Sequence, residues 1–381
     1  MRTAMFIRAQ VSDVGAKRWG WALPFAFFAL ACNGTGPETC TVQLDSGCWT
    51  FLGLEGERVT TVAETPRWGL MAGTFNHGLF QLNPAIHSWV PVGLAPLWIS
   101  SILYTPSVPP RLFVGVIPIG EQQTDAALFA KEIGDLNWQP WDGGLAARHD
   151  GHRGAHSIAM DPGNANRLFM GTSYPILRSE DGGRTWRSVW LTEDDFGMGV
   201  SAILVSPARD GHTWAVGRTA LFTAFVLRSS DWGDSWQFVD PTPQTDNGVV
   251  TLAVDSSDDQ RLFAGDTFGV LASEDGGASW RRVLSTQVPG FVAGLVTVAG
   301  ALYAVANENQ RLPADTAGPP ISDLGLYRSQ DGGHTWDTMP VPPGLGGARA
   351  VALDLEGRLL IGTDPGPLGL GLWRVDLLRT Q

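Results

Sequence analysis

The stretch Ser179-Glu180-Asp181-Gly182-Gly183-Arg184-Thr185-Trp186 decides the fold, because its Ser-x-Asp-x-Gly-x-(Ser/Thr)-Trp order occurs four times in the chain. The other copies lie at 229–236, 273–280 and 329–336. The Asp can accept hydrogen bonds from its own turn, the Gly permits a positive φ, and the Trp buries a large ring as the next strand begins. The pattern predicts four tight β-hairpins whose structural residues are Asp181, Asp231, Asp275, Asp331, Trp186, Trp236, Trp280 and Trp336.

A longer unit surrounds each copy. It consists of an apolar strand, a strand resembling Leu-Phe-x-Gly, a variable loop, and a strand that runs into the Asp turn and the Trp. Units of four strands and about 40–56 residues are typical of β-propeller blades. The second strand can be followed through seven units, at 70–73, 112–115, 168–171, 214–217, 262–265, 302–306 and 359–362.

The seventh unit supplies only three strands, whereas Gly47–Gly53 reads as a fourth strand without a unit of its own. Pairing the two would cover both exposed sheet edges. We therefore predict an all-β fold, a single seven-bladed β-propeller over 45–377 whose N-terminal strand closes the last blade, with a tail at 378–381. If the second or sixth unit, which carry long insertions, is misread, the ring would have six or eight blades.

The first 31 residues read as a signal peptide, because basic residues precede the apolar run 19–31, which is too short to span a bilayer. The run ends Phe-Ala-Leu-Ala-Cys at 28–32, which resembles a bacterial lipobox. That resemblance implies that Cys32 is lipidated and becomes the first residue of the mature protein. Ordinary signal cleavage near residue 31 and an uncleaved anchor are the alternatives.

Residues 32–44 read as a polar tether between the lipid and the fold. Export would place Cys40 and Cys48 in an oxidising compartment, where a disulfide closing this short loop is plausible. Two cysteines alone do not make a metal site. We expect an exported lipoprotein of the cell envelope, held to the membrane through its lipid anchor only and facing the periplasm or the exterior.

The charge balance excludes one broad class of partner. The chain has 26 Lys and Arg against 38 Asp and Glu, a net charge of −12, and removal of residues 1–31 makes the remainder more acidic. Such a surface repels nucleic acid, and no run of basic residues overrides this repulsion. We therefore expect no nucleic-acid partner, and we expect a monomer.

The four Asp turns resemble those of the BNR/Asp-box β-propellers, and the resemblance covers about residues 45–377. This group includes sialidases, family-74 xyloglucanases, the sortilin-type receptor ectodomain and photosystem II assembly factors. The resemblance implies that the Asp boxes lie on hairpins between third and fourth strands, away from the ligand face, where they hold turns. It is specific for the fold and not for the function.

The resemblance to the enzymes can be tested by residue. Sialidases use three Arg, a Tyr nucleophile with a Glu, an acidic Asp, and an Arg-Ile-Pro segment that is absent here. Of the four Tyr, only Tyr174 is expected on a ligand-face loop. The xyloglucanases place their carboxylates between two propellers, whereas this chain has the length of one, and the photosystem factors use an Arg-rich patch, whereas this chain is acidic. We identify no catalytic residue and predict no cofactor.

The loops between second and third strands, and between successive units, would line the ligand face. The richest is 141–157, where the imidazoles of His149, His152 and His156 have a spacing that could bind Zn or Cu. Its glycines favour a solvated loop, so we predict no metal site. The other candidate ligand-binding residues are His77, Tyr174, Arg218, Asp266, Phe268 and Asp364.

The leading hypothesis is a scaffold that presents these loops to a protein or a glycan without chemistry of its own. The competing hypothesis is a glycoside hydrolase or lyase that acts on an extracellular glycan. It requires two carboxylates about 5–10 Å apart on the ligand face, one of them with a raised pKa.

Overall fold

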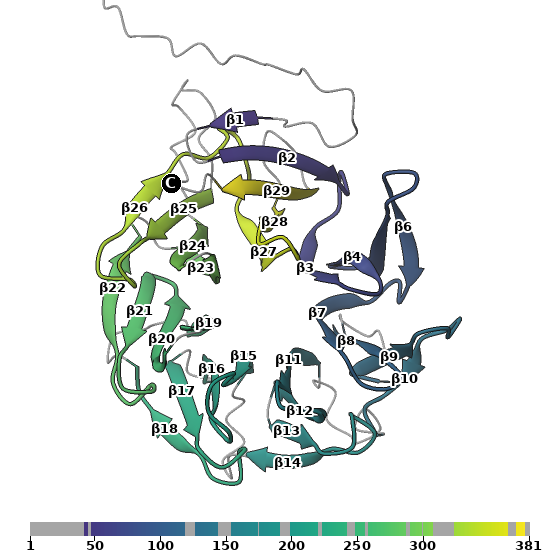
Figure 1. Cartoon of the computed structure of the whole chain (residues 1–381), viewed down its shortest axis with the longest axis horizontal. Helices are drawn as coiled ribbons and strands as arrows, with labels where there is room; N and C mark the ends of the chain where they lie inside the picture. The colour runs from purple at the N-terminus through teal and green to yellow at the C-terminus, as the bar shows by residue number, and fades with distance from the viewer. Residues whose placement is uncertain are drawn as a thin grey trace, which may run out of the picture. The chain divides into compact units, whose positions relative to one another are not determined.

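The computed structural model describes residues 42–44, 47–118, 126–143, 154–173, 175–190, 199–219, 223–241, 248–255, 258–286, 290–298, 300–307, 324–364 and 371–377. Regular secondary structure in these ranges is β-strand, and they contain no helix long and apolar enough to cross a membrane. Seven antiparallel sheets stand as blades around a central opening (Figure 1). The prediction of a single seven-bladed β-propeller is confirmed.

The first three blades each contain four strands in antiparallel order, from the inner strand outward. Blade 1 is β3 (Val59–Thr65), β4 (Gly69–Thr74), β5 (Leu79–Asn83) and β6 (Ser88–Gly93). Blade 2 is β7 (Trp98–Thr105), β8 (Arg111–Ile117), β9 (Leu128–Glu132) and β10 (Gln139–Pro140). Blade 3 is β11 (Ala155–Asp161), β12 (Asn164–Thr172), β13 (Ile176–Ser179) and β14 (Arg187–Trp190).

The next three blades repeat this order. Blade 4 is β15 (Gly199–Val205), β16 (Thr213–Arg218), β17 (Ala224–Ser229) and β18 (Gln237–Val239). Blade 5 is β19 (Val249–Asp255), β20 (Asp258–Asp266), β21 (Gly269–Ser273) and β22 (Arg281–Ser285). Blade 6 is β23 (Phe291–Val298), β24 (Ala301–Asn307), β25 (Leu324–Ser329) and β26 (Asp337–Met339).

Blade 7 joins the two ends of the described chain. It contains β27 (Ala348–Leu353), β28 (Leu359–Thr363) and β29 (Gly371–Leu377), and β2 (Gly47–Gly53) pairs with β29 as its fourth strand. Trp49, which is fully buried, lies in this closing strand. The predicted closure by the N-terminal strand is therefore correct. A short strand that the sequence did not suggest, β1 (Val42–Leu44), pairs with β2 and makes this sheet five-stranded.

The core consists of clusters that join neighbouring blades. One cluster, for example, packs Phe169 and Ile176 of blade 3 against Phe225 and Leu227 of blade 4. Another packs Tyr303 of blade 6 against blade 7. Because each blade buries its faces against the next, a ring without a free end is the arrangement that leaves no sheet face exposed.

The four Asp boxes share one hydrogen-bond pattern. In the first, Asp181 accepts bonds from the Thr185 amide at 2.9 Å, the Thr185 hydroxyl at 2.6 Å and the Ser179 hydroxyl at 2.8 Å. In the last box, Asp331 accepts the equivalent hydrogen bonds from Thr335, and these bonds lower its pKa. The second Gly of each box has a positive φ of 79–87°. The Trp that ends each box is only partly buried and directly precedes the fourth strand, which differs from the expected buried ring.

Each box is also held by the blade before it. The carbonyl at the fourth position of the box, where φ is positive in all four, accepts a hydrogen bond from that neighbour. The donors are the indole nitrogens of Trp141 and Trp214 and the guanidinium groups of Arg178 and Arg261. The boxes therefore connect successive blades as well as closing turns.

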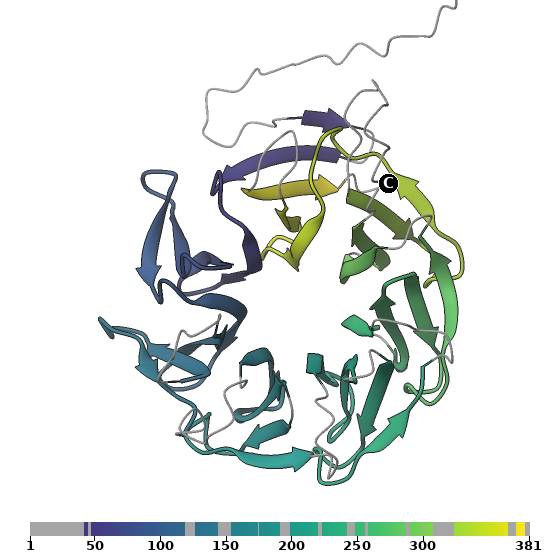
Figure 2. The ribbon, with the colours of Figure 1, turned by 180° about the vertical axis from the view of Figure 1, so that it is seen from behind.

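The strand order divides the loops between two faces of the ring (Figures 1 and 2). We call the loop face the one formed by the connections between second and third strands and between blades. We call the Asp-box face the one formed by the turns between first and second strands and between third and fourth strands. The predicted ligand-binding residues come from connections of the first kind.

Candidate functional site

The predicted acids of the loop face are both in ion pairs. Asp266, at the end of β20, is 1% exposed and receives two bonds from Arg282, at 2.9 and 2.5 Å. It also accepts the amide of Phe268, so it fixes the turn that carries this ring. Asp364, after β28, lies 2.5 Å from Arg349 and 3.5 Å from Arg58. The sequence predicted these two acids to bind a ligand, whereas in the structure they hold neighbouring arginine side chains.

The predicted histidines of this face have separate environments. His77 lies 2.7 Å from Glu57 at the junction of blades 7 and 1. His156 is the second residue of β11, and its Nε2 is 2.9 Å from the Ser173 hydroxyl. Burial, and then the charge of Arg218, lower the pKa of His156, which favours its neutral form. His149, His152 and Tyr174 lie outside the described residues, as do Cys32 and Cys40, while Cys48 is disulfide-bonded.

A connected series of side chains crosses the loop face from blade 6 to blade 2. Arg349 lies over the Phe291 ring at 5.4 Å and bonds Asp364, whose other neighbour, Arg58, lies over the Phe75 ring at 5.4 Å. The Phe75 ring in turn lies 5.0 Å from that of Trp98. We call this series the aromatic–arginine arc, which consists of Phe291, Arg349, Asp364, Arg58, Phe75 and Trp98.

A bulge present in every inner strand explains the position of the arc. The residue directly before each bulge is fully buried, as Val59 and Ile99 are. The residue before that buried one is large in three blades, where it is Arg58, Trp98 and Phe291. In the other four it is Gly154, Gly199, Gly248 and Gly347. Bulky side chains at this position therefore gather on one side of the opening.

The geometry of the arc suits binding more than acid–base chemistry. The Arg58 and Arg349 side chains are each 43% exposed, and the three rings are partly buried, so donors and apolar surface are both accessible. Among the described carboxylates, the resolved pKa shifts are all downward, at Glu274 and the four box Asp residues. A hydrolase acid would need a shift in the opposite direction. The described residues also contain no cluster of three or more potential metal ligands.

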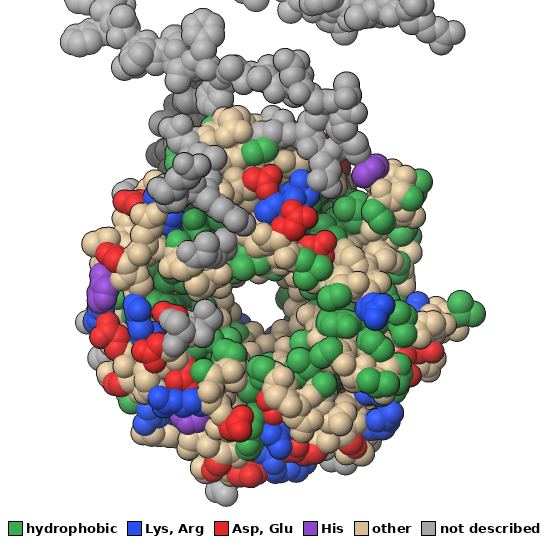
Figure 3. All heavy atoms as spheres, viewed as in Figure 1, with side chains coloured by type: hydrophobic (Ala, Val, Ile, Leu, Met, Phe, Trp, Pro, Cys, Tyr) green, Lys and Arg blue, Asp and Glu red, His purple; other side chains and the backbone are tan. Residues whose placement is uncertain are grey.

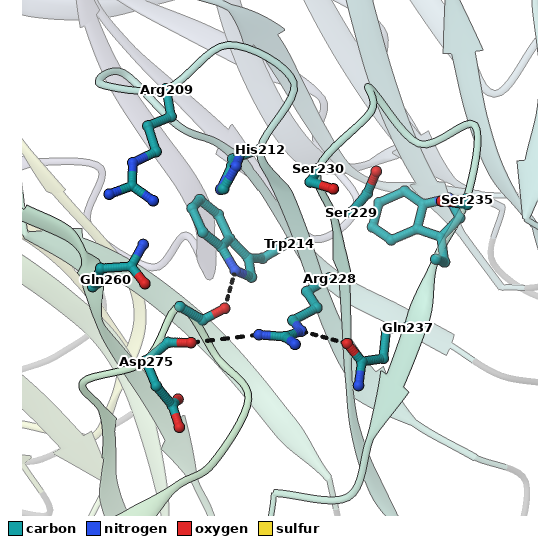
Figure 4. Close-up of a pocket in the computed structure, with 12 residues that line it drawn as sticks. Arg209, His212, Trp214, Arg228, Ser229, Ser230, Ser235, Gln237, Gln260 and Asp275 are labelled. Atoms are coloured by element: carbon teal, nitrogen blue, oxygen red, sulfur yellow. Dashed lines mark hydrogen bonds between the residues drawn. The ribbon is translucent and has the colours of Figure 1, made fainter.

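Among the described residues, two hollows open on the side of the Asp-box turns. One, of about 450 Å³, lies between blades 7 and 1 and is lined by Glu64, Arg67, Trp68 and Arg358, among others. Asp354, Glu356 and Asp376 surround Arg358. Figure 3 shows acidic and basic side chains side by side over blade 7. The second, of about 380 Å³, lies between blades 4 and 5 (Figure 4).

Sequence reasoning did not find most of the arc. Phe75 lies two residues before the predicted loop residue His77, so the alignment of the repeats could have placed it on the same loop. Arg58 and Arg349 both pair with Asp364. Arg58 lies near the other end of the chain, and Arg349 lies on the neighbouring strand, so no local sequence pattern identifies either ion pair. Aligning the inner-strand starts of the seven units would have shown that Arg58, Trp98 and Phe291 replace glycine.

No known family profile matches this chain. A probable oligoxyloglucan-reducing end-specific xyloglucanase of Neosartorya fischeri is 30% identical over 215 residues, which are 53% of this chain and 24% of that protein. The chloroplastic photosystem II stability/assembly factor HCF136 of Oryza sativa subsp. japonica is 26% identical over 152 residues, 38% of this chain and 35% of that protein. The chain spans well under half the length of both relatives.

Among solved structures, YCF48 bound to a D1 peptide superimposes with a TM-score of 0.59 at 14% identity, covering 89% of this chain and 99% of that one. At this identity the likeness concerns the fold. The Asp-box geometry, the seven blades and this structural likeness all indicate the same fold. The chain is a seven-bladed BNR-like β-propeller that shares its fold with YCF48 and has sequence similarity to segments of xyloglucanases and HCF136.

Proposed function

We propose that this protein is a binding scaffold whose aromatic–arginine arc holds a segment of a partner protein without chemical conversion. The observation that carries the proposal is the arc itself, because exposed Arg and aromatic side chains are the types that contribute most at protein interfaces. Asp364 holds Arg58 and Arg349 in place, which lowers the entropy lost when they bind a partner.

The chemistry of the arc describes the segment that it would accept. The rings of Phe75 and Trp98 offer an apolar surface, and the two guanidinium groups offer donors on either side of Asp364. A segment with an apolar side chain next to a carboxylate or a free backbone carbonyl would satisfy both. The solved structure of YCF48 with a D1 peptide shows that a propeller of this size can bind a peptide.

The proposal places the scaffold in the cell envelope, exported by residues 1–31 and anchored by a lipid on Cys32. The sequence at 19–32 supports this location. Metabolic labelling with a fatty acid should mark the full chain and should not mark Cys32→Ser. Equal labelling of the two proteins would exclude lipidation at this cysteine.

The second candidate function is glycoside hydrolysis, and the similarity to a xyloglucanase over 53% of this chain favours it. Carboxylates on loop-face connections outside the described residues would have to supply the acid and the base. The two candidates differ in one simple respect, because only the hydrolase generates new reducing ends.

The experiment that separates them uses one preparation of the mature chain. A photoreactive amino acid at Trp98 should crosslink to a protein in envelope extract, and the same amino acid at the exposed Arg184 on an Asp box should not. Arg58→Ala with Arg349→Ala should abolish the crosslink. In parallel, xyloglucan oligosaccharides should gain no reducing ends. Release of reducing sugar, or equal crosslinking from both positions, would overturn the scaffold proposal.

A further inference from the structure

The hollow between blades 4 and 5 lies away from the arc and is lined by side chains that donate hydrogen bonds. Its volume is about 380 Å³, and Arg209, His212, Arg228, Ser230, Gln237 and Gln260 contribute to its wall. Figure 4 shows Arg209 and His212 on one side of buried Trp214 and Arg228 on the other. Two of these side chains, Arg209 and Arg228, carry guanidinium groups.

A comparison between blades shows what is missing from this hollow. The residue before the box serine is Arg178 in blade 3 and Arg228 in blade 4. Arg178 contacts two carboxylates, Glu180 of its own box at 2.9 Å and Asp234 of the next box at 3.1 Å. At the equivalent positions around Arg228 the chain has Ser230 and Ala278. Arg228 therefore lacks both of the carboxylates that contact Arg178 in blade 3.

Arg228 has only neutral partners among the described residues. It donates to the side-chain oxygen of Gln237 at 2.8 Å and, more weakly, to the backbone carbonyl of Asp275 at 3.4 Å. In blade 3 the corresponding Arg178 also bonds the fourth carbonyl of the next box, but in blade 4 the Trp214 indole occupies that carbonyl. Arg228 thus keeps both a net charge and unused donor capacity at the edge of the hollow.

The one carboxylate that lines the hollow does not neutralise Arg228. Burial raises the pKa of Asp275, but hydrogen bonds from Ser279 and Ser273 outweigh it and lower the pKa to about 2. Both oxygens of this side chain accept bonds within their own box, and Figure 4 shows them directed away from Arg228. Arg209 has an ion pair at 3.2 Å with the buried Asp259, which does not line the hollow.

We propose that this hollow is a second binding site, which accepts an aspartate or glutamate side chain of a peptide. The incoming carboxylate would take the place beside Arg228 that Glu180 and Asp234 occupy beside Arg178. Ser230, Gln237 and Gln260 can then bond the peptide backbone. Trp214 is 1% exposed, so its ring offers no open face to a ligand. The site is independent of the arc on the loop face.

The test measures binding of the peptide acetyl-Glu-Asp-Glu-amide to the full-length chain in detergent by calorimetry, with acetyl-Gln-Asn-Gln-amide and galacturonate as comparison ligands. Salt at about 0.15 M limits long-range repulsion from the acidic surface to a Debye length of about 8 Å. The acidic peptide should bind, and the amide peptide should bind at least about tenfold more weakly, because a charge-assisted bond is lost. Equal binding of the two peptides, or tighter binding of galacturonate, would overturn the proposal.

Three variants locate the site. Arg228→Gln should weaken the acidic peptide about tenfold or more, whereas Arg184→Gln, at an exposed box Arg of blade 3, should leave it unchanged. Ser230→Glu supplies the carboxylate that blade 3 has at this position, so it should compete with the peptide and abolish binding while the protein stays folded. Ser230→Gln, which has the same length without the charge, should retain most binding. Unchanged affinity in Ser230→Glu or in Arg228→Gln, with thermal unfolding as the check of folding, contradicts the site.

The indole N–H of Trp236 gives an independent readout. The Trp236 side chain lines the hollow, and its indole nitrogen is buried and has no acceptor among the described residues. Its resonance, assigned by Trp236→Phe, should shift when the acidic peptide is added and should not shift in Ser230→Glu. A resonance that does not respond to saturating peptide would place the binding elsewhere on the molecule.

Discussion

The Asp-box hairpins and the aromatic–arginine arc use similar residue types for opposite purposes. Each box repeats the same three bonds to one Asp, and four blades carry it with distances that agree within about 0.1 Å. The arc is assembled from different residues on consecutive blades. Blade 5 has one Asp–Arg pair beside a ring, Asp266 with Arg282 and Phe268, but this pair stays within its own blade. A feature repeated in many blades serves the ring, because the ring is what the blades share. A feature that breaks the repeat is where a specific partner can be recognised.

The largest expected effect compares two tryptophans. Trp49 has no exposed surface in the strand that closes the ring, whereas Trp98 is partly exposed in the arc. Trp49→Ala should cost about 3–5 kcal/mol of unfolding free energy, as for a large core truncation. Trp98→Ala should cost well under half of that and should weaken partner binding. Denaturant unfolding measures both, and similar losses from the two variants would contradict the division between framework and arc.

The next effect compares the two acids of the loop face. Asp266 is 1% exposed and satisfies Arg282 with two bonds, so Asp266→Ala leaves a partly buried cation without its partner. We expect a loss of about 2–3 kcal/mol, below the 3–5 kcal/mol typical of a fully buried pair because Arg282 is partly exposed. The control is Asp364→Ala, whose two arginines reach solvent. A loss from Asp364→Ala as large as that from Asp266→Ala would show that the arc contributes to the framework.

A smaller effect should follow from pH through the boxes. The folded pKa of Asp275 is about 2, below its unfolded value, so its stabilising contribution is complete above the unfolded pKa and is lost as pH falls from about 4 to about 2. Asp275→Ala should cost about 1 kcal/mol near neutral pH, because the carboxylate is exposed, and should flatten the acid limb of the stability curve. Unfolding midpoints measured at several pH values test this. An unchanged acid limb would mean that other groups control acid unfolding.

The repeat explains why the fold could be predicted and the arc could not. The positions of the boxes and of the seven second strands are local patterns with a fixed spacing, and they led to the correct blades and to the closure of β29 by β2. Asp364 also read as a ligand residue from its place in the repeat. Its partners could not be read, because the ring brings Arg58, from the start of the chain, next to it. Contacts that form only when the ring closes produce no recognisable pattern in the sequence of either segment.

The same reasoning applies to the hollow between blades 4 and 5. Four boxes looked equivalent in the sequence, and the chemistry between them was hidden in positions that the pattern leaves free. Ser230 and Ala278 are such positions, and they matter because their counterparts Glu180 and Asp234 neutralise Arg178. The variable positions of a repeat are therefore informative once the structure shows which of them face each other across a blade boundary.

The smallest effect on stability should come from Asp364→Asn, and it is the sharpest test of the arc. The change removes one charge and keeps the shape, and since the side chains of Arg58 and Arg349 are both 43% exposed, water can replace the lost ion pairs. We expect unfolding free energy to change by no more than about 0.5 kcal/mol.

The effect of Asp364→Asn on partner binding should differ from its effect on stability. Without the charge that holds them, the two arginines move more freely, so a partner pays a larger entropy cost, while a partner carboxylate gains from the removed repulsion. The sign of the change in affinity therefore identifies the partner: an acidic segment should bind Asp364→Asn more tightly, and a neutral segment should bind it more weakly, as measured by titration against wild type.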